Sequence, residues 1–162
     1  MKKTKKLLAC LIAAATMFTM GSTAFAATTV DTTKDHDRVT VEKVYKLTNA
    51  DTASPKETFT LEQVGNGKVK DGEATSAPAL GIITGAEFAK TAATIEGATG
   101  NITVALPKYD NVGVYEYTLK EVAGKTAGVT YYGKEIKLTV TVVNGADGKL
   151  RIAAVHTEAV GE

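Results

Sequence analysis

From residue 39 onward, the sequence alternates between apolar and polar residues in several short stretches. The clearest is 136–142, where Ile, Leu, Val and Val occupy every second position, and the segments 39–47 and 115–121 follow the same rule. Successive side chains of a β-strand point to opposite faces, so this period indicates strands with one buried face. No comparable helical stripe is present. The alternation therefore limits the chain to an all-β architecture.

Short strands separated by turn-forming residues are typical of a β-sandwich. The segment 144–148, Asn-Gly-Ala-Asp-Gly, predicts a hairpin connection. The segment 65–78 is rich in Gly, Lys and Ala and predicts a long surface loop. Residues 80–97 are ambiguous, with a short helix over 86–93 as one interpretation. The strands that we expect cover 39–47, 59–61, 102–106, 114–122, 136–142 and 150–156.

Two charged residues occupy positions that the alternation assigns to the buried face. Lys43 shares its face with Val39, Val41 and Tyr45, and Glu121 closes the alternating run that begins at residue 115. An unpaired buried charge is very costly, so both residues need a structural reason. One interpretation is a tolerated inward salt bridge, or side chains whose charged ends reach water. The other is a reaction centre.

The reaction-centre interpretation depends on how burial changes the two groups. Burial lowers the pKa of a lysine and raises the pKa of a carboxylic acid. A neutral Lys43 amine could attack a carboxamide carbon while a protonated Glu121 polarises its oxygen and transfers protons. The product would be an amide between side chains, with ammonia released. Lys46, the nearest other lysine, falls on the opposite face of its strand and is expected to meet solvent.

The N-terminus predicts an export signal over 1–26. A basic start is followed by an apolar stretch too short for a membrane span, and small residues precede a cleavage site after Ala26. We expect a flexible segment over 27–38 and one domain over 39–162, secreted and free of the membrane after cleavage. Cleavage would also remove Cys10, the only cysteine, so the secreted chain could form no disulfide.

Charge and motif content exclude several classes of function. Removing four lysines with the signal leaves 15 Lys and Arg against 18 Asp and Glu, a net charge of about −3, which argues against nucleic-acid binding. Neither a nucleophile elbow nor a phosphate-binding loop is present. His36 and His156 have no companions at metal-ligand spacing. We therefore expect no metal, no cofactor and no conventional enzyme activity.

Five segments contain motifs that belong together. The most specific is 113–121, which contains the pattern Tyr-x-Tyr-x-Leu-x-Glu and ends at Glu121. The other segments are 39–43, Val-Thr-Val-Glu-Lys; 55–61, Pro-Lys-Glu-Thr-Phe-Thr-Leu; 128–132, Gly-Val-Thr-Tyr-Tyr; and 138–142, Leu-Thr-Val-Thr-Val. Together they resemble a known family, the streptococcal-type pilin isopeptide-linkage domain of Gram-positive bacteria, and the resemblance extends over most of 39–156.

The resemblance implies an immunoglobulin-like sandwich of the collagen-adhesin B type. It also implies a self-generated Lys–Asn isopeptide bond between the first and last strands, with Lys43 as the reacting lysine and Glu121 as the promoting acid. The family's asparagine lies in a final strand that would follow residue 162, so we expect the domain to be C-terminally incomplete. Asn144 is an internal candidate because it continues the every-second-residue pattern of the inward-facing positions 136, 138, 140 and 142. The alternative interpretation of Asn144 is the first residue of an Asn-Gly turn.

The function that this resemblance implies is a structural subunit or stalk domain of a pilus or cell-wall surface protein. Its partners would be other pilin or surface-protein subunits, with sortase as the polymerising enzyme and Lys108 as a candidate acceptor lysine. An alternative function is a ligand-binding adhesin module whose 65–97 insertion contacts a host or matrix ligand. A secreted enzyme is a third, disfavoured interpretation because no catalytic cluster is visible.

Overall fold

The computed structural model describes residues 23–27 and 37–160 of the 162-residue chain. Most of the expected export signal, the 28–36 part of the N-terminal segment and His36 lie outside the described residues. Within the described part every regular element is a β-strand, and none is a helix of the length and hydropathy needed to cross a bilayer. The strands are β1 (Thr23–Ala27), β2 (Arg38–Tyr45), β3 (Glu57–Phe59), β4 (Leu61–Gln63), β5 (Lys68–Gly72), β6 (Ile83–Thr84), β7 (Ala86–Phe88), β8 (Ala98–Ala105), β9 (Gly113–Glu121), β10 (Glu135–Asn144) and β11 (Leu150–Ala159).

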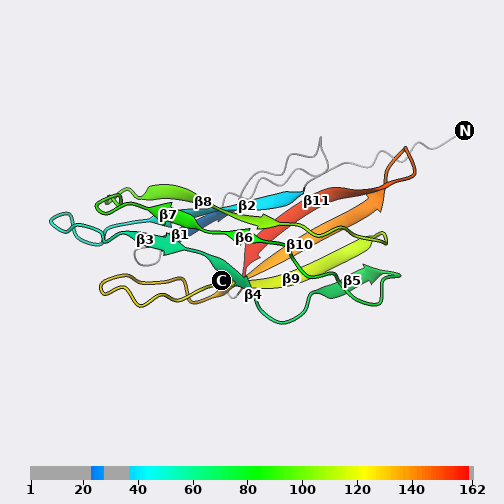
Figure 1. Cartoon of the computed structure of the whole chain (residues 1–162), viewed down its shortest axis with the longest axis horizontal. Coiled ribbons are helices and arrows are strands. Elements are labelled where there is room, and N and C mark those ends of the chain that lie inside the picture. The colour runs from blue at the N-terminus through cyan, green and yellow to red at the C-terminus, as the bar shows by residue number, and fades with distance from the viewer. Residues whose placement is uncertain (1–22, 28–36, 161–162) are drawn as a thin grey trace, which may run out of the picture.

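The strands form two antiparallel sheets and one small two-stranded ribbon (Figure 1). The first sheet has the order β1-β2-β8-β6. The second has the order β11-β10-β9-β4, and β5 also pairs with β9. The ribbon joins β3 to β7. Because the long strands β2 and β9 belong to different sheets, a contact between their inward side chains links the two layers.

The core contains the apolar residues that the alternation assigned to inward faces. On β10 the buried positions are Ile136, Leu138, Val140 and Val142, while the residues between them are half-buried or exposed. The strands β2 and β9 show the same alternation. The predicted all-β sandwich is therefore confirmed, and the period of two reflects burial of one face of each strand.

Two local expectations were wrong. The segment 65–78, expected to be a loop, contains β5, whose Val69 pairs with Tyr115 on β9. The segment 86–93, for which a short helix was one interpretation, begins with β7, which pairs with β3. In both cases pairing with a distant strand decides the conformation, because the local sequence has little preference of its own. The 65–97 segment thus adds strands to the sandwich.

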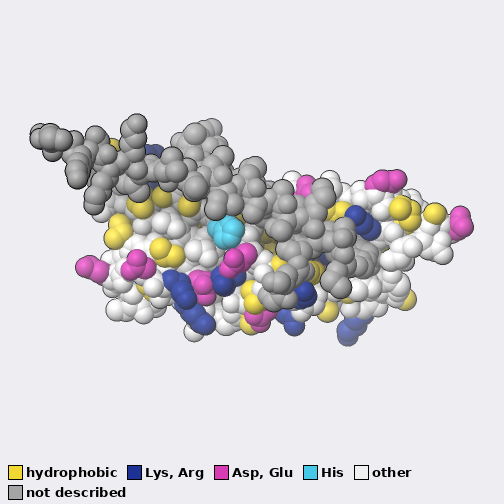
Figure 2. Space-filling model, turned by 180° about the vertical axis from the view of Figure 1, so that it is seen from behind, with side chains coloured by type: hydrophobic (Ala, Val, Ile, Leu, Met, Phe, Trp, Pro, Cys, Tyr) yellow, Lys and Arg dark blue, Asp and Glu magenta, His cyan; other side chains and the backbone are white. Residues whose placement is uncertain are grey.

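The predicted hairpin connection is present between β10 and β11. The backbone N–H of Gly145 donates to the carbonyl of Lys149 over 2.7 Å, and Gly148 has a φ of 75°, a value that favours glycine. On the face that Figure 2 shows, the described residues mix both signs of charge with scattered apolar side chains.

Candidate functional site

The inward-facing Lys43 and Glu121 meet between the two sheets. Alternation on β2 directs Lys43 toward the core, and alternation on β9 does the same for Glu121. The Nζ atom of Lys43 lies 2.5 Å from Oε2 of Glu121, and both side chains are 0% exposed. The structure thus confirms that both charged residues are buried, and it shows that each is the other's partner.

A backbone amide and an aromatic ring complete the surroundings of the pair. The N–H of Tyr132 donates to Oε1 of Glu121 over 2.9 Å, so the two carboxylate oxygens have different partners. The ring of Phe59 lies beneath Lys43, with Nζ 4.3 Å from the ring centroid. A protonated amine at this distance is attracted to the ring face. Sequence reasoning did not identify either group as part of the site.

Phe59 belongs to an aromatic cluster that excludes water from the lysine. Its ring meets Tyr45 edge-on with centroids 5.0 Å apart, and Phe88 packs against both rings. Gly100 pairs with Lys43 across β2 and β8, and a side chain there would meet the ring of Phe88. The glycine therefore makes room for the cluster. Edge-to-face contacts of this kind favour a well-ordered apolar wall.

The other edge of β2 is also covered by a strand in this structure. The backbone of β1 pairs with β2 in antiparallel register, which places Phe25 opposite Lys43 and the predicted cleavage residue Ala26 opposite Glu42. β2 thus has backbone partners on both sides, β1 on one and β8 on the other. This pairing satisfies the hydrogen-bonding groups of the strand that carries the lysine.

Burial shifts the protonation of both members of the pair. Removal from water lowers the pKa of Lys43 to about 8, although attraction to Glu121 opposes the shift. Burial raises the pKa of Glu121 above its ordinary value, while Lys43 and the Tyr132 amide oppose that shift. The charge of Glu57 adds to the increase. Both shifts favour neutral forms.

The geometry permits one simple exchange between these forms. Moving one proton from Nζ of Lys43 to Oε2 of Glu121 converts an ion pair into a neutral amine and a neutral carboxylic acid. The two atoms are joined by a direct, charge-assisted hydrogen bond, along which such a transfer can occur. A neutral amine is a nucleophile, and a neutral carboxylic acid is a proton donor. The site can therefore present both groups needed to attack a carboxamide.

The other candidate residues lie away from this pair. Asn144 is exposed at the end of β10 and leads into the Gly145 turn, so its inward parity does not produce an inward side chain. Glu135, at the other end of β10, pairs with Lys120, the neighbour of Glu121. At about 3.3 Å per residue, the length of β10 therefore places Asn144 roughly 30 Å from the buried pair. Lys108 is exposed in the connection between β8 and β9.

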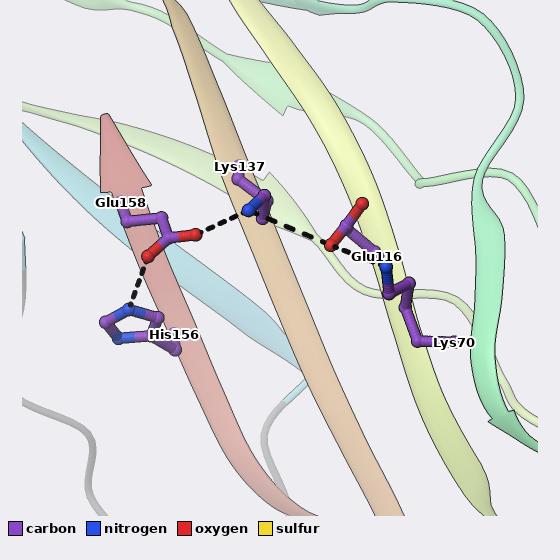
Figure 3. Close-up of polar contacts among 5 residues, drawn as sticks. All are labelled: Lys70, Glu116, Lys137, His156 and Glu158. Atoms are coloured by element: carbon purple, nitrogen blue, oxygen red, sulfur yellow. Dashed lines mark hydrogen bonds and ion pairs between the residues drawn. The ribbon is translucent and has the colours of Figure 1, made fainter. Parts of the chain in front are cut away.

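A second set of charged residues crosses the outer face of the sheet that contains β9, β10 and β11 (Figure 3). Lys137 binds Glu158 over 2.7 Å, and Glu116 lies 4.0 Å from Lys137. His156 approaches Glu158 at 3.7 Å. These side chains are accessible to water, and the described residues contain no group of three potential metal ligands close enough to hold an ion. This row is a set of surface ion pairs.

The fold and the buried pair define a class of protein, the β-sandwich domains that enclose a lysine–glutamate pair between their two sheets. Residues 39–161 match the model of the FctA family, described as a Spy0128-like isopeptide-containing domain, and the chain belongs to this family. The predicted pilin isopeptide family and immunoglobulin-like sandwich are thereby confirmed. No curated protein and no solved structure gives a significant match to the chain.

Proposed function

We propose that this protein is a structural domain of a Gram-positive pilus or cell-wall surface protein, stabilised by a self-catalysed Lys–Asn isopeptide bond. Lys43 is the nucleophile and Glu121 is the promoting acid. Membership of an isopeptide-containing family supports the structural role. The observation that carries the chemistry is the fully buried contact between Nζ of Lys43 and Oε2 of Glu121.

The proposed reaction balances without an oxidant or cofactor. Proton transfer gives neutral Lys43 and protonated Glu121. The amine attacks the Cγ carbon of an asparagine carboxamide, and Glu121 donates a hydrogen bond to the developing oxyanion. A new C–N bond forms, the original C–N bond breaks, and ammonia leaves after receiving its third hydrogen by way of Glu121. The reaction turns over once, because the lysine is consumed.

Such a bond would stabilise the domain in the way that a disulfide does. A crosslink reduces the conformational freedom of the unfolded chain, and by the chain-entropy model a loop of about 100 residues gains about 4.7 kcal/mol. The sequence has one cysteine, at position 10 within the predicted export signal. An amide crosslink is therefore the covalent route that suits a secreted form of this chain.

Mass spectrometry of the protein isolated from the surface of the cells that make it tests this proposal. The intact mass should be lower than calculated by one ammonia. Trypsin should cleave after Lys46 but not after Lys43, because only the second amine is blocked, and a branched peptide should join Lys43 to an asparagine-containing segment. The Glu121→Gln variant should keep a free Lys43. A wild-type protein that trypsin cleaves after Lys43 would overturn the proposal.

Polymerisation by sortase would use a second, accessible lysine. Lys108 is exposed at the end of the sandwich opposite the buried pair, where an enzyme could reach it. Subunits joined through Lys108 should yield a peptide branched at that residue, and the Lys108→Arg variant should remain monomeric. High-molecular-mass polymers from that variant would exclude Lys108 as the acceptor.

A further inference from the structure

The connection between β9 and β10, residues 122–134, contacts the reacting pair through its backbone. The N–H of Tyr132 holds Oε1 of Glu121, which leaves Oε2 for Lys43. Most residues of this connection are accessible to water, and none of them belongs to a strand that could hold it in place. Something must therefore fix the position of the amide relative to the carboxylate.

The adjacent residue, Tyr131, supplies that restraint. Its hydroxyl donates to Oε2 of Glu57 over 2.7 Å, which ties the connection to the start of β3. Its ring also packs against Phe59, with centroids 5.7 Å apart, and Phe59 is the ring beneath Lys43. Tyr131 thus contacts both ends of β3, the strand that carries the ring beneath Lys43. It also lies one residue from the amide that holds Glu121.

Glu57 is itself held in a defined orientation. The N–H of Thr58 donates to Oε1 of Glu57 over 2.9 Å, and the side chain of Thr126 also hydrogen bonds to it. Burial tends to raise the pKa of Glu57, but these hydrogen bonds and that from Tyr131 outweigh it, so the group is ionised at neutral pH. Gly124 leaves space for the Tyr131 hydroxyl, which a β-carbon at that position would contact.

We propose that Glu57 and Tyr131 are positioning residues for the crosslinking reaction: their hydrogen bond sets the Tyr132 amide that orients the Glu121 carboxyl toward Lys43. This inference depends on the proposed function for its purpose, although the arrangement itself can be tested without crosslinking. The hydrogen bond from the Tyr132 amide to Oε1 fixes the rotation of the Glu121 carboxyl group. The charge of Glu57 also lies close enough to disfavour a second carboxylate at Glu121.

The tether through Tyr131 and the charge of Glu57 should have opposite effects on the pKa of Glu121. In Tyr131→Phe the ring remains on Phe59 but the tether is lost, so the Tyr132 amide binds the carboxylate less well and the pKa of Glu121 should rise. In Glu57→Gln an acceptor for the Tyr131 hydroxyl remains but the charge is gone, so the pKa of Glu121 should fall. Disruption of packing alone would not separate the two variants in this way.

The experiment is a carbon NMR titration of the Glu121 carboxyl in the full chain, combined with hydrogen exchange at the Tyr132 amide. Tyr131→Phe should speed exchange of that amide by about five- to tenfold, the effect of losing one hydrogen bond. Glu62→Gln is the matched control: Glu62 follows Leu61, the partner of Glu121, but is exposed on the other face of β4. It should leave both measurements unchanged.

The outcomes separate this inference from the proposed function. Opposite shifts of the Glu121 pKa, with faster exchange in Tyr131→Phe, support the positioning role. Shifts in the same direction, or no change in either variant, overturn it. A wild-type protein without a branched peptide at Lys43 would instead remove the proposed function, whatever the titration shows. Where the bond forms, Tyr131→Phe should slow its formation without lowering its final yield.

Discussion

Replacing Lys43 with methionine tests whether the lysine and Glu121 stabilise the core as a pair. Methionine keeps most of the length and apolar volume of the lysine but removes Nζ. Glu121 would then remain fully buried, with the Tyr132 amide still donating to Oε1 but no partner on Oε2. The cost should arise from that carboxyl group and not from lost packing volume.

The magnitude follows from the burial of both charges. Removing one member of a buried ion pair typically costs about 3–5 kcal/mol, whereas replacing both by apolar residues of similar volume is close to neutral or stabilising. Because Glu121 can take up a proton, we expect about 3 kcal/mol for Lys43→Met. We expect a similar cost for Glu121→Leu. The double variant should lie within about 1 kcal/mol of the wild type, well below the sum of the single costs.

Urea denaturation followed by far-ultraviolet circular dichroism measures these free energies of unfolding, on chains whose intact mass shows no crosslink. Lys137→Met is the matched control. Lys137 makes the same type of contact with Glu158, at 2.7 Å instead of 2.5 Å, but its side chain is 36% exposed. An exposed pair is worth at most about 1 kcal/mol, so this variant should lose far less stability.

Two results would refute the reasoning. If Lys43→Met costs no more than Lys137→Met, burial does not amplify the interaction. If the cost of the double variant equals the sum of the single costs, the two residues do not act as a pair. Either result would also weaken the case that proton transfer between them prepares the amine.

Three further changes test other parts of the structure. The free energy of unfolding of the wild type, relative to Lys43→Met, should increase between pH 8, about the pKa of folded Lys43, and the ordinary lysine pKa. In this range the unfolded chain still holds a proton that the folded chain has released, so the increase is at most about 1.4 kcal/mol per pH unit. Urea titrations at several pH values measure it. Leu138→Ala, at a fully buried position, should cost about 2–5 kcal/mol, against about 0.5 kcal/mol or less for the exposed Val143→Ala on the same strand, and equal losses would contradict the assignment of faces. Gly100→Ala should cost about 1–3 kcal/mol in the same assay, because its β-carbon would lie 2.8 Å from the ring of Phe88, and an unchanged midpoint would show that the cluster can move aside.

The alternation of residue types predicted the main strands and the faces of their side chains. It assigned Lys43 and Glu121 to the core, and both are buried there. It failed where strands depend on partners: β5 and β7 have short, mixed sequences that pair only because β9 and β3 present edges to them. Alternation left Asn144 open between an inward side chain and the first residue of a turn, and the residue is exposed where β10 leads into the turn, because a strand that ends at a turn no longer has an inward face at its last residue.

Within the candidate site, sequence reasoning identified the two ionisable side chains and missed the groups around them. The Tyr132 contribution is a backbone amide, which every residue except proline possesses, so residue type gives no indication of it. The tether between Glu57 and Tyr131 joins positions 74 residues apart in the sequence. The contact of Phe59 with Lys43 likewise depends on how the ribbon of β3 and β7 packs against β2.

The sequence by itself determined that this protein is built from strands and that two charges of opposite sign face its interior, because a period of two and the cost of burying charge are local properties of the chain. Only the tertiary structure decided that those charges meet at 2.5 Å, that Phe59 lies beneath one and that the Tyr132 amide holds the other. The distances depend on how two sheets and a loop pack together. That packing turns a costly pair of buried charges into a site that can exchange a proton.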